Sequence, residues 1–289
     1  MRAEQVTEPW AEHGEGPVWW SGWGGLKYVD MLRGDVLSLA DDASVTRAHV
    51  GTVAAALRPR AGGGAVIATE RSFALASRND LSDARPIGDV WSDPAIRFND
   101  GACDPAGRFY CGTMAYAETT GAGTMYRLTA DGDDRLETTV VWAGVTISNG
   151  FGFSPDGSQA YYNDTPTRRT DVFDYDEHDR LVNRRPLMTL TERDKGNPDG
   201  LCVDSDGCVW VALWDGSAVR RYTPDGRLDG VVELPVTRVT ACTFGGADLD
   251  TLYITTSRTG IPAGEQPAAG AFLACRPGVT GQPPLTFAV

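Results

Sequence analysis

The sequence predicts an all-β protein that folds as a six-bladed β-propeller, and three observations lead to this prediction. Short runs rich in Val, Tyr, Trp, Phe and Thr alternate with Asp-Gly, Pro-Asp-Gly and Gly-Gly turns along the 289 residues. Helical periodicity is almost absent. One strand–turn–strand unit recurs six times, and a period of about 40–50 residues is typical of propeller blades with four strands each.

The repeats begin at residues 15, 54, 99, 149, 199 and 240, at steps of 39, 45, 50, 50 and 41 residues. In the three clearest copies a polar residue opens a short strand, a turn glycine follows eight positions later, and an aromatic residue comes soon afterwards. These openings and glycines are Asn99 and Gly107, Asn149 and Gly157, and Asp199 and Gly207. The alternative is a long β-sandwich, but sandwiches do not repeat one hairpin six times.

The six repeats account for residues 1–289 as a single domain, without a linker or a low-complexity segment between them. An unpaired strand at the edge of a sheet favours aggregation. We therefore expect a strand from residues 1–12 to pair with the last blade and to close the ring.

The charge and the hydropathy of the chain exclude several classes of partner. A net charge of −13, with no basic run, argues against nucleic acid, because affinity for phosphates comes largely from Lys and Arg. The longest apolar runs are too short to cross a bilayer. The first residues lack the apolar core of a secretory signal, so a cytoplasmic protein is expected, with no membrane partner.

The six cysteines include no Cys-x-x-Cys pair, which disfavours a zinc ribbon or a thioredoxin-like site. If the turn spans residues 204–207, Val203 faces Cys208, and Cys202 points to the opposite side of the sheet. The same counting places Cys103 and Cys111 on opposite faces. We therefore expect reduced, mostly buried thiols.

The first position of each repeat suggests a binding site. Equivalent positions of a propeller are related by rotation about the central channel, so channel-facing residues at one offset form a ring. Four of the six openings carry carboxylates or carboxamides, namely Glu15, Asn99, Asn149 and Asp199. Their oxygens are the ligands that a hard divalent cation prefers. Asn-Gly and Asp-Gly are also common turn dipeptides, but three of them in register across the repeat favour a site.

Other catalytic patterns are missing from the sequence. There is no Gly-x-Ser-x-Gly nucleophile motif, no phosphate-binding P-loop and no His-Glu-x-x-His. Ser148 has no histidine–acid pair placed to activate it. His13 is close to Glu15 in sequence and could line the mouth of the channel, although such a histidine is more often a surface residue.

The repeat motifs resemble those of the regucalcin-like senescence marker protein-30/gluconolactonase/luciferin-regenerating-enzyme family. The resemblance extends from about residue 12 to the C-terminal "GVTGQPPLTF", and the combination of "RFNDGACDPAGR" with "GTM" is specific. The matching stretches are "EGPVWW" from Glu15, "RFNDGACDPAGRFYCGTM" from Arg97, "ISNGFGFSPDGSQAYYND" from Ile147 and "NPDGLCVDSDGCVWVALWDG" from Asn197.

This resemblance implies a six-bladed propeller with one divalent ion near its centre. By motif, Glu15, Asn149 and Asp199 correspond to the metal ligands, and Asp199 also corresponds to the catalytic acid/base. All-oxygen ligands favour Ca²⁺, Mg²⁺ or Mn²⁺ over metals that prefer thiolates, and Zn²⁺ also accepts carboxylates. Ca²⁺ is the ion that we expect first.

The resemblance also implies substrate contacts. Arg97 and Asn99 match substrate-binding positions, with Asn99 near the metal through a water molecule. A further glutamate of the family contacts substrate soon after "GTM", and Glu118 is the nearest candidate here.

The implied reaction is hydrolysis of a small lactone, such as a sugar lactone, by a monomer or a weak homodimer. The ion polarises the lactone carbonyl, and Asp199 takes a proton from the attacking water and returns it to the leaving alkoxide. Arg97 orients oxygen atoms of the substrate. The alternatives are a calcium-dependent phosphotriesterase-like or aryl-esterase-like hydrolase and a non-catalytic calcium-binding propeller.

Overall fold

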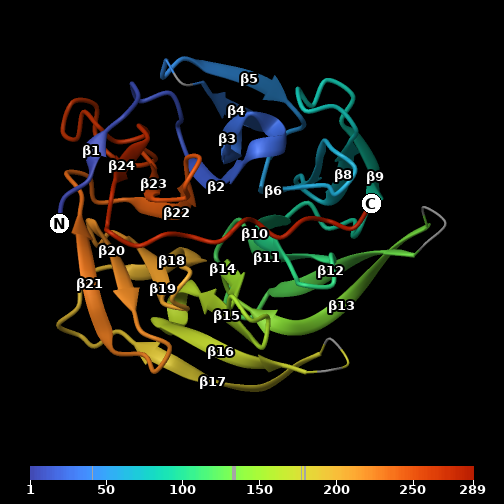
Figure 1. The fold of residues 1–289 in the computed structure, drawn as a ribbon. Coiled ribbons are helices and arrows are strands. Elements are labelled where there is room, and N and C mark those ends of the chain that lie inside the picture. Colours follow the sequence, from blue (N-terminus) through green and yellow to red (C-terminus); the bar gives the residue numbers. More distant parts are fainter. Residues whose placement is uncertain (41, 132–134, 177, 179) are drawn as a thin grey trace.

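The computed structural model describes residues 1–40, 42–131, 135–176, 178 and 180–289. Within this part of the chain, six four-stranded antiparallel sheets surround a central axis (Figure 1). The first strands of neighbouring blades contact one another all the way around: β2 with β6, β6 with β10, β10 with β14, β14 with β18, β18 with β22, and β22 with β2. The predicted six-bladed propeller is confirmed.

In the first five blades the strands follow one another outward from the channel in chain order, and in the sixth blade β1 from the N-terminus is the outermost strand, after β24. The strands are, blade by blade, β2 (Gly14–Trp20), β3 (Gly25–Asp30), β4 (Asp35–Leu39) and β5 (Val45–His49); β6 (Ala56–Pro59), β7 (Ala65–Ala68), β8 (Ser72–Ala76) and β9 (Arg85–Asp89); β10 (Ile96–Cys103), β11 (Phe109–Ala115), β12 (Gly123–Asp131) and β13 (Arg135–Val145); β14 (Ser148–Phe153), β15 (Gln159–Asp164), β16 (Arg169–Tyr175) and β17 (Leu181–Thr189); β18 (Asn197–Val203), β19 (Val209–Trp214), β20 (Ala218–Tyr222) and β21 (Leu228–Glu233); and β22 (Val239–Gly245), β23 (Thr251–Thr256), β24 (Leu273–Cys275) and β1 (Glu4–Gln5).

The only helical turns in the described residues are short 3-10 turns: η1 (Ser21–Trp23), η2 (Met31–Arg33) and η3 (Thr165–Thr167). None of the helices in the described part of the chain is long and apolar enough to span a membrane.

The two ends of the chain close the ring. Strand β1 pairs antiparallel with β24, placing Glu4 opposite Ala274 and Gln5 opposite Leu273. The expected strand from residues 1–12 is therefore present, and it forms the outer edge of the sixth blade. After β24 the C-terminal segment crosses one face of the propeller (Figure 1), where the Phe287 amide donates to the Pro59 carbonyl over 2.8 Å.

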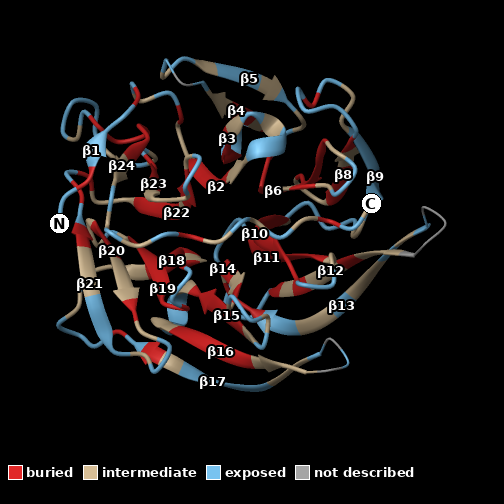
Figure 2. Ribbon diagram, in the orientation of Figure 1, coloured by how far each residue is buried: buried red, intermediate tan, exposed pale blue. Residues whose placement is uncertain are grey.

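Apolar side chains fill the spaces between blades. Phe73 of blade 2 packs between Phe98 and Phe109 of blade 3, with ring centroids 4.6 and 5.7 Å away. Figure 2 shows the buried residues concentrated in the inner strands, whereas the outer strand β9 is exposed along its length. Each fully buried aromatic of this kind stabilises the fold by about 1.5–3 kcal/mol, so the packing between blades holds the inner strands, and the side chains that they carry, in place.

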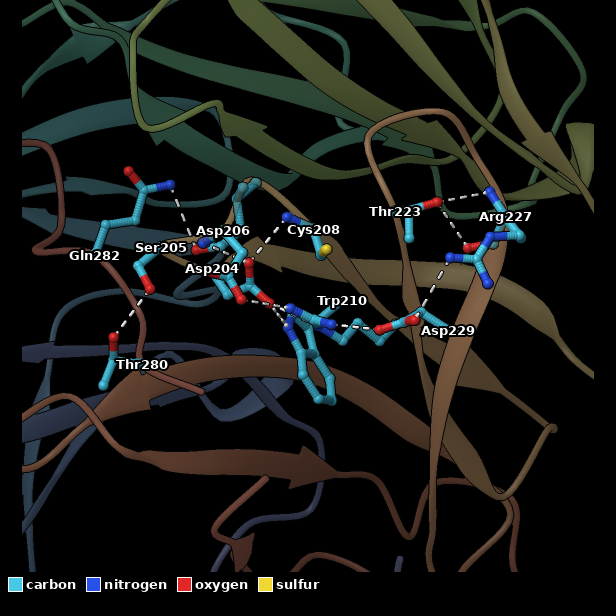
Figure 3. Close-up of polar contacts among 12 residues, drawn as sticks. Asp204, Ser205, Asp206, Cys208, Trp210, Thr223, Arg227, Asp229, Thr280 and Gln282 are labelled. Atoms are coloured by element: carbon cyan, nitrogen blue, oxygen red, sulfur yellow. Dashed lines mark hydrogen bonds and ion pairs between the residues drawn. The ribbon is translucent and has the colours of Figure 1, made fainter. Parts of the chain in front are cut away.

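A buried aspartate organises the hairpin between β18 and β19. Asp204 Oδ1 accepts hydrogen bonds from the backbone amides of Asp206 and Cys208, and its Oδ2 accepts from Trp210 Nε1 (2.9 Å) and Arg221 Nε (2.8 Å). Figure 3 shows this carboxylate at the centre of the turn. Asp204 is therefore a structural anchor. The Asp206 side chain is 63% exposed and pairs with Arg221.

The register of this hairpin differs from the one expected. The Asp204 amide donates to the Cys208 carbonyl over 3.0 Å, leaving a three-residue turn that ends on Gly207 with φ of 82°. Val203 therefore pairs with Val209, not with Cys208, and Cys202 pairs with Trp210. Counting outward from the Asp204–Cys208 pair puts Cys202 and Cys208 on the same face, so the predicted opposite faces are wrong.

The same error applies to the corresponding hairpin of blade 3. Cys103 pairs with Phe109, and Cys111 pairs with Gly101, so both cysteines lie on one face of the sheet. A turn one residue shorter than assumed reverses every facing assignment. All six cysteines are free, and the Sγ atoms of Cys202 and Cys242 are 3.6 Å apart.

Candidate active site

One cavity of about 390 Å³ collects the residues that the sequence singled out. It lies at the end of the channel where the inner strands β2, β10, β14 and β18 present their first residues. Its lining includes all six predicted site residues: Glu15, Arg97, Asn99, Glu118, Asn149 and Asp199. Residues separated by up to 184 positions in the sequence thus share one site.

Each polar residue of the ring sits at a β-bulge in an inner strand. The pairing with the next strand is interrupted between Phe98 and Gly101 in β10, between Ser148 and Phe151 in β14, and between Pro198 and Leu201 in β18. Asn99, Asn149 and Asp199 lie in these gaps, and in β2 the gap begins at Glu15 itself. Bulges bend a strand and re-aim its side chains.

The bulges explain the recurrent Asn-Gly and Asp-Gly dipeptides. They are not turn dipeptides, because the glycines Gly150 and Gly200 lie inside strands where a neighbouring blade approaches closely. A Cβ atom on Gly150 would stand 2.6 Å from the Leu201 nitrogen, and one on Gly200 would stand 2.5 Å from the Ala241 Cβ. Glycine inside a strand pattern is a known signal for a bulge or a close approach, so the sequence carried this information.

A chain of hydrogen bonds orients the amide side chains. Arg97 Nη1 donates to Asn99 Oδ1 (2.7 Å), and Asn99 Nδ2 donates to the Ser148 carbonyl (2.7 Å) and to Asn149 Oδ1 (3.2 Å). Asn149 Nδ2 in turn donates to Thr165 Oγ1 (2.8 Å). Asn149 Oδ1 has two lone pairs and accepts one hydrogen bond, from Asn99, so one lone pair remains for another partner.

The Ser148 hydroxyl takes no part in the cavity lining. Ser148 is fully buried, and its Oγ receives a hydrogen bond from the Tyr162 hydroxyl over 3.0 Å. The structure therefore agrees with the view that this serine is not an activated nucleophile.

Buried carboxyl groups dominate the electrostatics of the site. Burial, followed by repulsion from Asp100, raises the pKa of Glu15 to about 8. Burial, followed by repulsion from Glu15 and Asp100, raises the pKa of Asp199 well above its ordinary value. The Glu15 carboxylate accepts one hydrogen bond from the Gly16 amide, at 2.9 Å. Without a compensating cation these groups favour their protonated forms.

Asp100 is a site-associated residue that sequence reasoning missed. It is buried beside Asn99 in the β10 bulge, its Oδ1 accepts a hydrogen bond from the Gly101 amide (2.7 Å), and burial raises its pKa. The predicted ring includes only the first polar residue of each repeat, although "NDG" places an acid directly after Asn99.

The donor set fits a hard divalent cation. Glu15 and Asp199 supply carboxylates and Asn149 supplies an amide oxygen, which is the chemistry that Ca²⁺, Mg²⁺ and Mn²⁺ prefer. Among the described residues, no three His, Cys, Asp or Glu side chains gather closely enough to hold a metal by themselves. A metal here therefore needs the amide oxygen of Asn149, and it would offset the repulsion between the two acids.

Glu118 reaches the cavity from the turn that follows β11. Its φ of 53° lies in the left-handed region, which is uncommon for a residue other than glycine. The Glu118 amide donates to the Ala115 carbonyl over 2.9 Å, which fixes this turn. A non-glycine residue held in this conformation at a cavity is a frequent feature of functional sites.

His13 lines the cavity and is not a surface residue. Its Nδ1 forms a 2.8 Å hydrogen bond with Ser257 Oγ. Burial, followed by the positive charges of Arg97 and Arg238, lowers the pKa of His13 to about 3, so the imidazole is neutral at physiological pH. Trp214 and Asp215 also line the cavity. Trp214 is the last residue of β19, and Asp215 begins the turn that follows it. Neither residue belongs to the first strand of its repeat, on which the predicted ring was based.

Fold and site together define a six-bladed β-propeller with an acidic, amide-bearing cavity at one end of its channel. The family model described as the SMP-30/Gluconolactonase/LRE-like region matches residues 13–258. The chain belongs to this family.

Relatives of this chain span nearly its whole length. It is 36% identical to regucalcin from Danio rerio, over 99% of this chain and 98% of that protein. It is 34% identical to the pentonolactonase XacC from Haloferax volcanii, over 89% of this chain and 86% of that protein. The structure of a calcium-binding protein, regucalcin, from Agrobacterium tumefaciens is similar, with a TM-score of 0.88 and 26% identity, over 100% of this chain and 97% of that one.

Proposed function

We propose that this protein is a metal-dependent hydrolase that opens a small lactone, such as a sugar lactone. The observation that carries the proposal is the single cavity that joins Glu15, Asn149 and Asp199 to Arg97 and Asn99. The name of the pentonolactonase relative, and that of a 6-deoxy-6-sulfogluconolactonase from Pseudomonas putida that is 34% identical over 93% of this chain, support lactone chemistry.

Glu15, Asn149 and Asp199 would hold the divalent cation. When bound, the cation supplies Lewis-acid polarisation of the lactone carbonyl. The all-oxygen donor set and the calcium-binding relative of known structure favour Ca²⁺, and Zn²⁺, Mn²⁺ and Mg²⁺ are compatible with the same atoms.

Asp199 is the proposed acid/base. Its carboxylate takes a proton from the water that attacks the lactone carbonyl, and it returns this proton to the alkoxide that leaves when the ring opens. The side chain is held for this role because β18 places it in a bulge, with Gly200 packed against the neighbouring blade. A group that both accepts and releases a proton allows the same site to complete the reaction.

Arg97 and Asn99 are proposed to hold the substrate. Arg97 Nη1 is engaged by Asn99 Oδ1 and the Phe98 carbonyl, and the guanidinium lies 5.7 Å from the centre of the Tyr116 ring. Among the described residues, Arg97 Nε is buried without a hydrogen-bond partner, and Arg97 lines the cavity, so the guanidinium keeps a donor for an oxygen of the substrate. Glu118 lines the same cavity and would accept hydrogen bonds from substrate hydroxyls.

The test is a substrate panel followed by pH-stat in the presence of Ca²⁺. Aldonolactones and simple γ- and δ-lactones are expected to be hydrolysed with kcat/KM at least about 100-fold above that for phenyl acetate or a phosphotriester. A preference for the aryl ester or the phosphotriester would favour the alternative hydrolase. No turnover of any of these compounds would favour a non-catalytic calcium-binding propeller.

A further inference from the structure

Part of the cavity lining has no role in the proposed chemistry. Besides the polar groups, the lining includes Met114, Ile147 and Pro166, together with the indole of Trp214 and the imidazole ring of His13. Trp214 is the largest of these side chains and is only partly buried. It therefore keeps apolar surface that faces the space where a ligand would lie.

The position of Trp214 is fixed by contacts on several sides. The Arg238 guanidinium lies 4.8 Å from the centre of the indole ring, and the His13 ring lies edge-on with centroids 5.8 Å apart. The Trp214 backbone pairs with Asn197 on one side and forms a bridge with Arg238 on the other. A side chain held by a cation, a second ring and two backbone partners loses little further freedom when a ligand binds.

The turn beside Trp214 supports the same view. Asp215 and Ser217 both have positive φ, 59° and 52°, although neither is glycine. Asp215 also accepts an ion pair from Arg238 Nε at 3.4 Å, so the cation that packs on the indole is itself anchored. Strained backbone conformations of this kind persist where the surrounding structure over-determines them, and they cluster at ligand sites.

We propose that Trp214 is a specificity-determining residue that contacts the C–H groups of the substrate ring. This inference rests on the proposed lactone hydrolysis and assigns the recognition of the carbon skeleton to the indole. The polar groups of the cavity recognise oxygen atoms, for which water competes. Contact between an aromatic surface and C–H groups is favourable instead because it removes apolar surface from water. A hydroxylated ring offers both C–H groups and oxygen atoms.

The contact should act on binding and leave the chemical step unchanged. The C–H groups of the ring are present in the substrate and in the transition state alike, so the indole stabilises both equally. Such uniform binding lowers KM without raising kcat. Covering one side of a sugar-sized ring removes on the order of 50 Å² of apolar surface from water, which corresponds to about ten-fold in affinity.

The test uses calorimetric titration with glucono-δ-lactam, which resembles a sugar lactone but has an amide in place of the ester, with Ca²⁺ present. Trp214→Ala is expected to weaken lactam binding by about ten-fold, and Trp214→Phe, which keeps a ring, by about three-fold. Trp10→Ala is the matched control, because Trp10 is 44% exposed and lies outside the cavity, and it should bind like the wild type. With lactone substrates, KM should rise in parallel while kcat stays within about two-fold.

The role of Trp214 would be overturned by unchanged lactam affinity in a folded Trp214→Ala protein, or by no measurable lactam binding by the wild type. A fall in kcat with unchanged KM would also contradict it, because that pattern belongs to a group acting in the transition state. Failure of the wild type to hydrolyse lactones contradicts the proposed function instead, and lactam binding is measured independently of that reaction.

Discussion

Replacing Asp199 by asparagine is expected to lower kcat for lactone hydrolysis by roughly 10³-fold, because proton transfer by a positioned side chain contributes about 10²–10⁴ to a rate. Asparagine keeps the shape of the side chain and an oxygen ligand, but it cannot accept a proton from water. Initial rates followed by pH-stat under saturating lactone and Ca²⁺ measure the effect.

The control for this variant lies in the same hairpin. Asp206 sits in the turn between β18 and β19 with a 63% exposed side chain, and its contact is an ion pair with Arg221 at 3.1 Å. Exposed ion pairs contribute about 0–1 kcal/mol, so Asp206→Asn should keep kcat within about two-fold of the wild type. Equal activity of a folded Asp199→Asn protein and the wild type would refute the assigned role.

Asp199→Asn should also leave the metal-free protein at least as stable as the wild type at neutral pH. Burial raises the pKa of Asp199 in the folded state. The folded protein therefore retains a proton that the unfolded chain releases, and the stability of the metal-free form falls as the pH rises above the ordinary carboxyl pKa. Asparagine does not titrate and avoids this cost. Thermal unfolding in chelator separates this prediction from a loss of activity caused by misfolding.

Gly101→Ala is expected to destabilise the protein by about 3 kcal/mol or more, because overpacked sites have little room to relax. Gly101 ends the β10 bulge that carries Asn99. A Cβ atom there would stand 2.1 Å from the Tyr110 carbonyl oxygen and 2.8 Å from the Cys111 Cα, both in the adjacent strand β11. These are backbone atoms, so relief requires β10 and β11 to separate. Equilibrium unfolding in urea measures the change.

Gly62→Ala is the matched control for this glycine. Apart from Gly62 itself and its two chain neighbours, no heavy atom of the described residues lies within 4 Å of the position that a Gly62 Cβ would take, and its φ is not in the left-handed region. The same substitution there should change the free energy of unfolding by no more than about 0.5 kcal/mol. Similar small effects for both variants would mean that the bulge of β10 tolerates a side chain.

The fold and the ring of polar residues could be predicted because both are periodic in the sequence. The turn glycine at a constant offset fixes the phase of each repeat, and the phase places Asn99, Asn149 and Asp199 at equivalent positions. Rotation about the propeller axis then brings them together. The structure places these three side chains, with Glu15, around one cavity.

What could not be predicted depends on local backbone geometry or lies outside the first strand of each repeat. The prediction that Cys202 and Cys208 point to opposite faces of the sheet was wrong, because the turn between them is one residue shorter than expected. A shift of one residue moves every side chain of a strand to the other face. Trp214 was missing from the predicted ring because that prediction used only the first strand of each repeat, whereas Trp214 ends the second strand β19. It pairs with Asn197 there, as the lining residue Met114 pairs with Arg97 in blade 3. Asp100 was overlooked because a bulge allows two consecutive residues to be buried near the channel, whereas a regular strand would send one of them to the opposite face.

Removal of the metal tests the central claim most directly. Wild-type protein is treated with EDTA until its metal content is far below one ion per chain, and hydrolysis of glucono-δ-lactone is followed by pH-stat against the spontaneous rate. If Glu15, Asn149 and Asp199 hold a required cation, activity should fall to the spontaneous rate and return when Ca²⁺, Mn²⁺, Zn²⁺ or Mg²⁺ is added. Full activity in the metal-depleted protein would contradict this account.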